Sequence, residues 1–560
     1  MKGLGDEKKR GSEGTAQPKS KRPPRRTPPW DRAEARERLE AEAWDLVVVG
    51  GGIVGAGVAR DAALRGLSVA LVEAGDWACG TSSRTTKFAH GGLRYLELLD
   101  FGLVREALAE RATLLSIAPH LTRATPFLLP VYGGGGRPSW QLRAGLALYD
   151  ALAGGTRLGR HAMLDRPGAL AREPLLEPDR LRGAGVYWDA RVRDARLVVE
   201  TVADARRAGA VAATRCAVGA LERWSRGWVA EVTDRIAEEG FSLRGRAWVN
   251  ATGPWADEIR ARAAPGRPSL LRPTKGVHVV VSRDSLPLRD PTALFAPDGR
   301  LVFAVPEGRW AYLGTTDTVD GRMVDDVSVA ERDVAYLIEA ANGALASDLE
   351  RSDVVGAWAG WRPLVRSEPA SGRSAAAPGE ISREEEVEET APGLWTVVGG
   401  KLTTFRAMAE EAVDRVAERL GRRLGPCVTS ERPLVSPEVG GVGPPAGSDP
   451  AAVARARELF GPDADDVFAR WREEPASAEP IAAGFPFTPA EVDRAAREMV
   501  HTLEDLVDRR LLALPGGAPI EEEALRAVAS IPALGWDEDR VDAEVSAFRH
   551  GRSRRGRLRR

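Results

Sequence analysis

WDLVVVGGGIVGAGVARDAALRGLSVALVE, residues 44–73, is the stretch of sequence that decides the fold. It begins with a β-branched apolar run that ends at Gly50, continues with small and apolar residues over 53–65, and closes with the apolar run SVALVE at 68–73. Short apolar runs of this kind are typical of strands buried on both faces, and a helix between two such strands connects them in parallel. The stretch therefore predicts a strand–helix–strand unit and an α/β fold class.

The turn between the first strand and the helix has the GxGxxG pattern of a dinucleotide-binding loop. Gly50 permits the tight turn, Gly52 lets the backbone approach a pyrophosphate, and Gly55 lets helix and strand pack closely. The helix beginning at Ile53 presents its N-terminus to the phosphates. Glu73 follows about twenty residues later, where a carboxylate accepts hydrogen bonds from the adenosine ribose and disfavours the 2′-phosphate of NADP.

Two later glycine-containing turns favour FAD over NAD as the cofactor. Thr252 and Gly253 follow a predicted late strand, and residues 399–402 (GGKL) precede a helix that is expected to begin near Thr403. Each turn offers a further close approach of the backbone, which an extended dinucleotide needs. We therefore expect FAD on a two-dinucleotide-binding fold.

Length and composition predict several domains. A chain of 560 residues with 43% apolar residues is long enough for roughly three cores. Overall we expect an α+β protein, with a Rossmann-type FAD domain around a parallel sheet, an antiparallel β-rich substrate domain and a small α-helical C-terminal domain. The expected units are a disordered basic and proline-rich tail (1–43), a discontinuous FAD-binding domain (44–110, 185–265 and 391–425), a substrate domain (111–184 and 266–390), a linker (426–450), a helical C-terminal domain (451–548) and a basic tail (549–560).

Charge and cysteine usage exclude several classes of function. The net charge of −2 gives the body of the protein no general affinity for polyanions, so we expect no nucleic-acid partner. Cys79, Cys216 and Cys427 are far apart and lack metal-ligand spacing, so neither an iron–sulfur cluster nor another metal site is expected. No apolar run reaches the ~18 residues of a membrane span. The basic tails are expected to remain solvated, with binding to an anionic membrane or nucleic acid as the alternative.

Four further motifs identify a family. They read TSSRTTKFAHGGLRYLE (81–97), VNATGPW (249–255), KGVHVVV (275–281) and GGKLTTFR (399–406). In combination they resemble the FAD-dependent glycerol-3-phosphate dehydrogenases, which belong to the wider superfamily of FAD-dependent oxidoreductases that includes D-amino-acid oxidase.

The resemblance extends over roughly 45–408, and residues 490–510 resemble the helical C-terminal domain of the same family. It implies that the chain oxidises sn-glycerol 3-phosphate to dihydroxyacetone phosphate by hydride transfer to FAD and passes the electrons to membrane quinone. It also implies a cytoplasmic enzyme, peripheral on the inner face of the cell membrane. The motifs add these cofactor-binding residues to the loop glycines and Glu73: Thr81, Ser82, Ser83, His90, Gly91, Gly92, Thr252, Gly253, Gly399, Gly400, Lys401, Leu402 and Thr403.

The substrate requires a phosphate site and a base. A phosphate monoester needs cationic donors close to the flavin, and we expect Arg94, Arg362 and Lys401 to supply them, although an ordinary salt bridge is the alternative for each. Alcohol oxidation also needs a base within hydrogen-bond reach, and His278, His90 and an uncharged Lys401 are the candidates, although a histidine on a buried strand is often only core. Further substrate contacts are expected from Tyr95, Arg383, Thr315 and Asp317.

Several alternatives stay open. The chain is alternatively an amine or hydroxy-acid oxidase, a glycerol-phosphate oxidase that uses oxygen, or a flavin-holding protein without catalysis that binds a partner. Residues 140–152 (WQLRAGLALYDAL) predict either an interfacial helix for the membrane surface or an ordinary core helix. The oligomeric state is also open, with a homodimer as one possibility.

Overall fold

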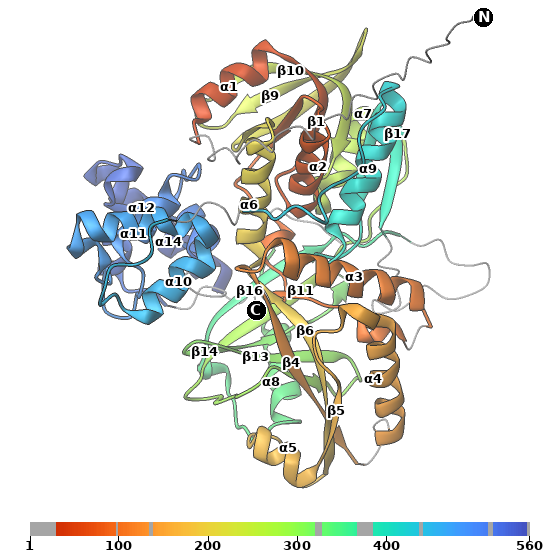
Figure 1. Cartoon of the computed structure of the whole chain (residues 1–560), viewed down its shortest axis with the longest axis vertical. Coiled ribbons are helices and arrows are strands. Elements are labelled where there is room, and N and C mark those ends of the chain that lie inside the picture. Colours follow the sequence, from red (N-terminus) through yellow and green to blue (C-terminus); the bar gives the residue numbers. More distant parts are fainter. Residues whose placement is uncertain are drawn as a thin grey trace, which may run out of the picture.

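The computed structural model describes residues 30–96, 99–133, 138–319, 327–366, 385–435, 441–512 and 519–556. Two sheets lie one above the other in Figure 1, and a cluster of helices from the end of the chain lies beside them. Each of the three parts has a hydrophobic core of its own. The mixed α/β architecture predicted from the sequence is confirmed.

The first sheet contains the predicted strand–helix–strand unit. Its strand order is β17-β18-β10-β1-β2-β7, and β10, β1, β2, β7 and β18 run parallel. A β8–β9 hairpin continues from β10. The bounds are β1 (Ala43–Val49), β2 (Val69–Val72), β7 (Val211–Ala213), β8 (Cys216–Trp224), β9 (Gly227–Asp234), β10 (Glu239–Asn250), β17 (Glu386–Ala391) and β18 (Leu394–Val398), and the helices packed on this sheet are α2 (Ile53–Leu64), α6 (Asp194–Arg207), α7 (Ala256–Ala263) and α9 (Phe405–Leu420).

The second sheet is antiparallel apart from the β4–β12 pair, as expected for the substrate domain. Its order is β15-β11-β14-β13-β12-β4-β6-β3, with β16 on β11 and β5 on β6. The bounds are β3 (Phe88–Ala89), β4 (Thr122–Tyr132), β5 (Ala162–Asp165), β6 (Leu181–Val192), β11 (Thr274–Ser282), β12 (Thr292–Phe295), β13 (Leu301–Glu307), β14 (Trp310–Gly314), β15 (Thr318–Val319) and β16 (Val354–Arg362), with helices α3 (Phe101–Ile117), α4 (Ser139–Ala153), α5 (Arg166–Arg172) and α8 (Glu331–Asn342).

Two segments lie in a different sheet from the one predicted for them. Residues 185–192 were expected in the FAD-binding domain, but they form the end of β6, whose antiparallel register with β4 extends to Val192. Residues 386–390 were expected in the substrate domain, but they lie in β17. A turn at Gly393, with φ of +80°, folds β17 back on β18 as a hairpin, so this segment joins the first sheet.

Both segments expected as disordered tails are partly helical. Helix α1 (Arg32–Ala41) is capped at its N-terminus by Asp31, whose side chain accepts a hydrogen bond from the Glu34 amide. It is held to the first sheet by an Arg32–Asp234 ion pair of 2.7 Å and by the buried Leu39. At the other end, α14 extends over Glu538–Gly556, beyond the expected boundary at residue 548. Residues 1–29 and 557–560 lie outside the described residues.

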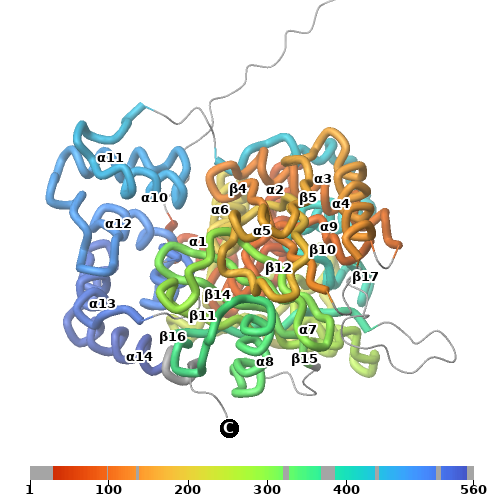
Figure 2. Tube along the Cα trace, turned by 90° about the horizontal axis from the view of Figure 1, so that it is seen from below, coloured from red at the N-terminus to blue at the C-terminus, as the bar shows by residue number. Residues whose placement is uncertain are grey.

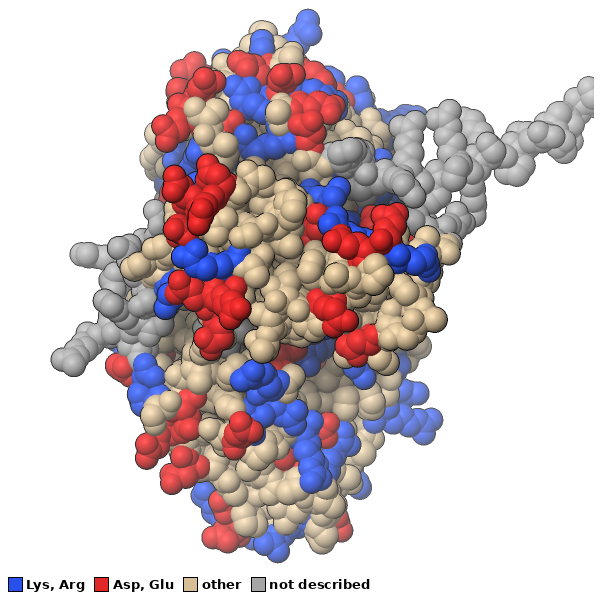
Figure 3. All heavy atoms as spheres, turned by 90° about the vertical axis from the view of Figure 1, so that its left-hand side faces the viewer, with Lys and Arg blue, Asp and Glu red and all other residues tan. Residues whose placement is uncertain are grey.

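The expected helical C-terminal domain is confirmed and lies against the side of the first sheet that carries α6, in both views (Figures 1 and 2). A capping box between Thr488 and Glu491 begins one of its helices. Among the described residues on its outer face, acidic and basic side chains are interspersed rather than segregated (Figure 3). The helices are α10 (Pro450–Phe460), α11 (Ala464–Glu473), α12 (Pro489–Ala496), a π-helix (Asp505–Arg510), α13 (Glu522–Ala529) and α14.

Candidate active site

The glycine loop sits at the carboxyl edge of the parallel sheet. Gly50, Glu73 and the Ala251–Thr252 turn follow the ends of the neighbouring strands β1, β2 and β10, and ligands of open α/β sheets bind at this edge. Gly50 has φ of +113°, and a Cβ there would lie 2.5 Å from the Ala251 carbonyl oxygen. A Cβ on Gly55 would overlap the carbonyl oxygen of Gly50. Both positions therefore require glycine.

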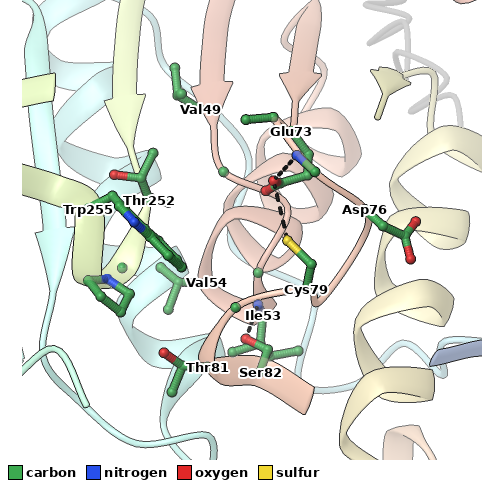
Figure 4. A pocket seen from close by; sticks show the side chains of 18 of the residues that line it. Val49, Ile53, Val54, Glu73, Asp76, Cys79, Thr81, Ser82, Thr252 and Trp255 are labelled. Carbon is green, nitrogen blue, oxygen red and sulfur yellow. Dashed lines mark hydrogen bonds between the residues drawn. The ribbon is translucent and has the colours of Figure 1, made fainter. Parts of the chain in front are cut away.

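Glu73 occupies the position expected of a ribose-binding carboxylate. Its two oxygens accept hydrogen bonds from the amides of Gly51 and Gly75, both at 2.6 Å, and the Cys79 thiol lies 3.6 Å away (Figure 4). Burial raises the pKa of Glu73, and the two amides oppose that shift. Burial, followed by the charge of Glu73, raises the pKa of Cys79 to about 12, so this thiol stays protonated.

A single cavity of about 810 Å³ connects this edge of the sheet with the later glycine turns. Its volume lies within the range of small-molecule and cofactor sites. The amide of Ile53 at the start of α2 donates to Ser82 Oγ at 3.0 Å, so the helix N-terminus and the Thr81–Ser83 turn face the same space (Figure 4). The predicted cofactor residues that line the cavity are Gly50, Gly52, Ile53, Glu73, Thr81, Ser82, Thr252, Gly253, Gly399, Gly400, Lys401 and Leu402.

The remaining predicted cofactor residues support this lining from outside. Gly55 packs α2 against the glycine loop, and Ser83 lines a second cavity. The His90 amide donates to Thr403 Oγ1 at 3.1 Å, which joins the HGG segment to the GGKLTT turn. The Gly91 amide donates to the Tyr149 hydroxyl at 2.9 Å. His90, Gly91, Gly92 and Thr403 are not among the residues that line the cavity.

A buried charged network holds the HGG segment in place. Asp189 Oδ1 accepts hydrogen bonds from the Gly91 amide at 3.2 Å, from the Tyr149 hydroxyl at 2.7 Å and from Arg111 at 2.8 Å. Burial raises the pKa of Asp189, and the Arg111 charge opposes the shift. Nearby, Lys401 Nζ lies 4.0 Å from the centre of the Tyr95 ring, a cation–π distance. The structure therefore brings Tyr95 together with Lys401, which lines the cavity.

The expected substrate residues on the second sheet form a second group. Arg362, at the end of β16, donates to Asp317 Oδ1 at 3.0 Å, to Thr315 Oγ1 at 2.9 Å and to the Thr316 carbonyl at 3.1 Å. Pro363, the next residue, lines the cavity. Arg94 is exposed on the 3-10 turn Leu93–Leu96, so its place in the anion site stays a prediction. Arg383 lies outside the described residues.

His278 is buried on β11 rather than exposed in the cavity. Its Nε2 is 3.0 Å from Thr86 Oγ1, and its ring stacks on Trp358 with centroids 4.4 Å apart. Burial lowers its pKa well below the usual value, and the positive charges of Arg362 and Lys87 act in the same direction. The imidazole is therefore neutral near pH 7, and the same burial and positive charges make its protonation unfavourable. It is not among the residues that line the cavity.

Some residues in and near the cavity were not predicted from the sequence. Glu385 has a pKa raised to about 7 by burial and by the charge of Glu106. Its neighbours at 384 and below lie outside the described residues, and no motif marks it. Asp76 was not predicted either. It follows Glu73 by three positions, and this closeness to a predicted cofactor-binding carboxylate was a signal in the sequence that pointed to it. The lining also includes Arg215 and Trp255, and from the C-terminal domain Thr502, Glu504, Asp505, Arg509, Glu544, Ala547 and Phe548.

Comparison with known proteins extends this picture to the whole chain. Residues 45–415 match the family described as FAD dependent oxidoreductase, and residues 445–541 match the C-terminal domain of alpha-glycerophosphate oxidase. The chain is 37% identical over 543 residues to glycerol-3-phosphate dehydrogenase 2 of Mycobacterium tuberculosis, covering 93% of this chain and 90% of that protein. It is 38% identical over 418 residues to aerobic glycerol-3-phosphate dehydrogenase of Staphylococcus aureus, covering 73% and 74%.

A solved structure is similar over nearly the same extent. The X-ray structure of the glycerol-3-phosphate dehydrogenase from Bacillus halodurans complexed with FAD superimposes with a TM-score of 0.73 at 29% sequence identity. The match covers 93% of this chain and 97% of that one. The similarity therefore includes both sheets and the helical C-terminal domain.

Proposed function

This chain belongs to the family of FAD-dependent glycerol-3-phosphate dehydrogenases, and we propose that it oxidises sn-glycerol 3-phosphate to dihydroxyacetone phosphate. It is an FAD-dependent oxidoreductase. The observation that carries the proposal is the full-length similarity to proteins of that name, together with a cavity that both the glycine loop and Lys401 line.

The residues around the cavity fit FAD. The glycine loop has no room for a Cβ at Gly50 or Gly55, and the Glu73 carboxylate lies within hydrogen-bonding distance of the loop amides where ribose hydroxyls would bind. The N-terminus of α2, which has no side-chain cap, would face the pyrophosphate. When bound, FAD supplies the hydride acceptor for alcohol oxidation.

We propose that Lys401 and Arg362 bind the phosphate group of the substrate. Tyr95 lies under Lys401 and fixes the direction of the ammonium group. Thr315 and Asp317 orient the Arg362 guanidinium, which leaves its position fixed for a charge-assisted contact with an anion.

His278 remains the proposed proton acceptor or substrate-orienting group, acting beside Thr86. Its neutral state is compatible with either role, the lowered pKa favours orientation over proton acceptance, and its Nε2 lies 3.0 Å from the Thr86 hydroxyl oxygen. Lys401 is the alternative base. A His278→Ala variant that reduces its flavin at the wild-type rate would exclude His278 as the base.

The test of the substrate is anaerobic reduction of the bound flavin. We expect glycerol 3-phosphate to bleach the visible flavin band, and Lys401→Met to raise the substrate concentration needed for half-maximal bleaching. Arg415→Met is the matched control, because Arg415 is exposed on α9 and forms an exposed ion pair with Glu411. A flavin band that responds to an amine or a hydroxy acid and not to glycerol 3-phosphate would contradict the proposal.

We further propose that the electrons pass to membrane quinone and that the enzyme lies on the inner face of the cell membrane. None of the helices in the described ranges is long and apolar enough to cross a bilayer. One face of α4, however, has Trp140 72% exposed and Leu148 38% exposed, with the exposed Arg143 between them. Its other face buries Leu146 and Tyr149. The inner face of α4 therefore packs as a core helix does, and its outer face has the composition of an interfacial helix, which supports the proposal.

Vesicles of anionic lipid test this proposal. We expect the protein to sediment with them, and Trp140→Ser with Leu148→Ser to abolish sedimentation while leaving anaerobic flavin reduction unchanged. Val428→Ser, at another exposed apolar residue, is the control. Unaltered sedimentation of the double variant would assign the membrane contact to another surface. Stoichiometric hydrogen peroxide with no reduction of added quinone would identify oxygen as the acceptor.

A further inference from the structure

The wall of the cofactor cavity at the Glu73 end is completed by the C-terminal domain. Thr502, Asp505 and Arg509 come from the π-helix region and Glu544 and Phe548 from α14, and they line the same cavity as Gly50 and Glu73. In the dinucleotide-binding fold, the carboxylate at the end of the second strand binds the adenosine ribose. The C-terminal domain therefore faces the adenosine half of the site.

A fully buried ion cluster joins the two domains at this point. Asp76, which is 0% exposed, accepts hydrogen bonds from both terminal nitrogens of Arg510 at 2.9 and 2.7 Å and from Arg509 Nε at 2.6 Å. Figure 4 shows the Asp76 carboxylate pointing away from Glu73, on the same loop. The C-terminal domain thus binds the loop that carries Glu73 on the side opposite to the Glu73 carboxylate.

The local backbone explains how two adjacent arginines reach one carboxylate. Residues Asp505–Arg510 form a π-helix, in which consecutive side chains diverge less than in an α-helix, and such segments are frequent at functional sites. Asp505 anchors the same turn, because it accepts hydrogen bonds from Arg215 at 2.7 Å and from Arg509 at 2.5 Å.

Arg215 links the cluster back to the loop. Its backbone amide donates to the Gly75 carbonyl at 2.9 Å, and the Gly75 amide donates to Glu73 at 2.6 Å. The positions of Glu73 and the π-helix are therefore connected by consecutive hydrogen bonds through the half-buried Gly75 and Arg215. Displacing the C-terminal domain would leave the buried Asp76 without either arginine partner, and the loop would lose its outer support. Arg509 would keep its contacts to Asp505 and Glu504 within the C-terminal domain.

We propose that the C-terminal domain is part of the FAD site, and that the Asp76–Arg509–Arg510 cluster couples its docking to retention of the cofactor. Tight binding requires the docked domain, and bound FAD in turn stabilises docking, because a coupling free energy is reciprocal. This inference goes beyond the oxidation of glycerol 3-phosphate and does not depend on which alcohol is the substrate.

The first test measures the affinity for FAD. The full-length protein is stripped of flavin and titrated with FAD, with binding followed by quenching of flavin fluorescence. We expect Asp76→Asn and Arg510→Lys to raise the dissociation constant by about tenfold or more, within the usual range of coupling between sites. Asp542→Asn and Arg526→Lys are the matched controls, because they alter an exposed ion pair within the C-terminal domain, and they should bind FAD as the wild type does.

The second test uses the wild type alone and so does not depend on whether a variant folds. Hydrogen exchange of the amides of residues 502–510 is compared with and without FAD. We expect FAD to slow this exchange. Exchange that is unaffected by FAD, or dissociation constants of both cluster variants within a factor of about two of the wild type, would overturn the proposal.

Discussion

The glycine loop gives the sharpest prediction, because its geometry separates a steric effect from a conformational one. Gly55 lies in the first turn of α2 and has ordinary helical dihedrals, so alanine is conformationally acceptable there. The methyl group would nevertheless overlap the carbonyl oxygen of Gly50. Gly50 has little room to retreat, since its own Cα already faces the Ala251 carbonyl.

We expect Gly55→Ala to displace the N-terminus of α2 from the loop. Overpacking against rigid groups costs up to about 3 kcal/mol, and if this appears in ligand binding, the affinity for FAD falls by about 100-fold. The assay is FAD titration of the stripped protein, combined with thermal unfolding of the stripped form to separate instability from lost binding.

Gly145→Ala is the matched control. Gly145 lies within α4, and a Cβ there would have open space around it. Alanine at this position should leave FAD binding unchanged and raise the unfolding free energy by about 0.5–1 kcal/mol, because glycine is the poorer helix former. A Gly55→Ala protein that binds FAD within a factor of about three of the wild type would refute the reasoning from close packing.

The remaining predictions concern buried charges. Because the pKa of Glu385 is raised to about 7 from an ordinary 4.5, its contribution to stability is present below pH 4.5 and is lost as the pH rises through about 7. Glu385→Gln should flatten this part of the dependence of urea midpoints on pH, and an unchanged profile would contradict the assignment. Asp189→Ala leaves Arg111 buried without its partner and should lower the unfolding free energy by about 3–5 kcal/mol; a loss below about 1 kcal/mol, that of an exposed pair, would contradict it.

Sequence patterns predict those parts of the fold that depend on residues close together in the chain. The run that ends at Gly50 forms β1, and Glu73 closes the second strand beside the glycine loop, because both depend on short-range periodicity and on the spacing of a few residues. Which of the two sheets a segment joins depends on contacts that its own sequence does not determine. Residues 386–390 pair with β18 through a turn of their own, and a pattern of alternating residues does not identify the partner strand.

The same distinction applies to the site. The residues that line the cavity and were predicted lie in glycine-rich motifs, where the backbone itself forms the wall. Asp76 and Arg510 are 434 positions apart, and neither lies in a motif that names the other. Two adjacent arginines in LEDLVDRRLL (503–512) are nevertheless followed by two leucines in a predicted helix, and long charged side chains at buried positions require partners.

The chemical nature of the domain contact bears on how the cofactor site is assembled. An apolar contact of the same size would stabilise docking at least as well, because desolvation offsets much of the attraction within a buried ion cluster. Apolar surfaces, however, tolerate small shifts in register, whereas Arg510 meets Asp76 only in one bidentate geometry. Since Asp76 is three residues from Glu73, a fixed position for the C-terminal domain becomes a fixed position for the Glu73 carboxylate, for which we propose ribose binding. The ion cluster therefore favours accuracy at the Glu73 end of the cavity over additional stability.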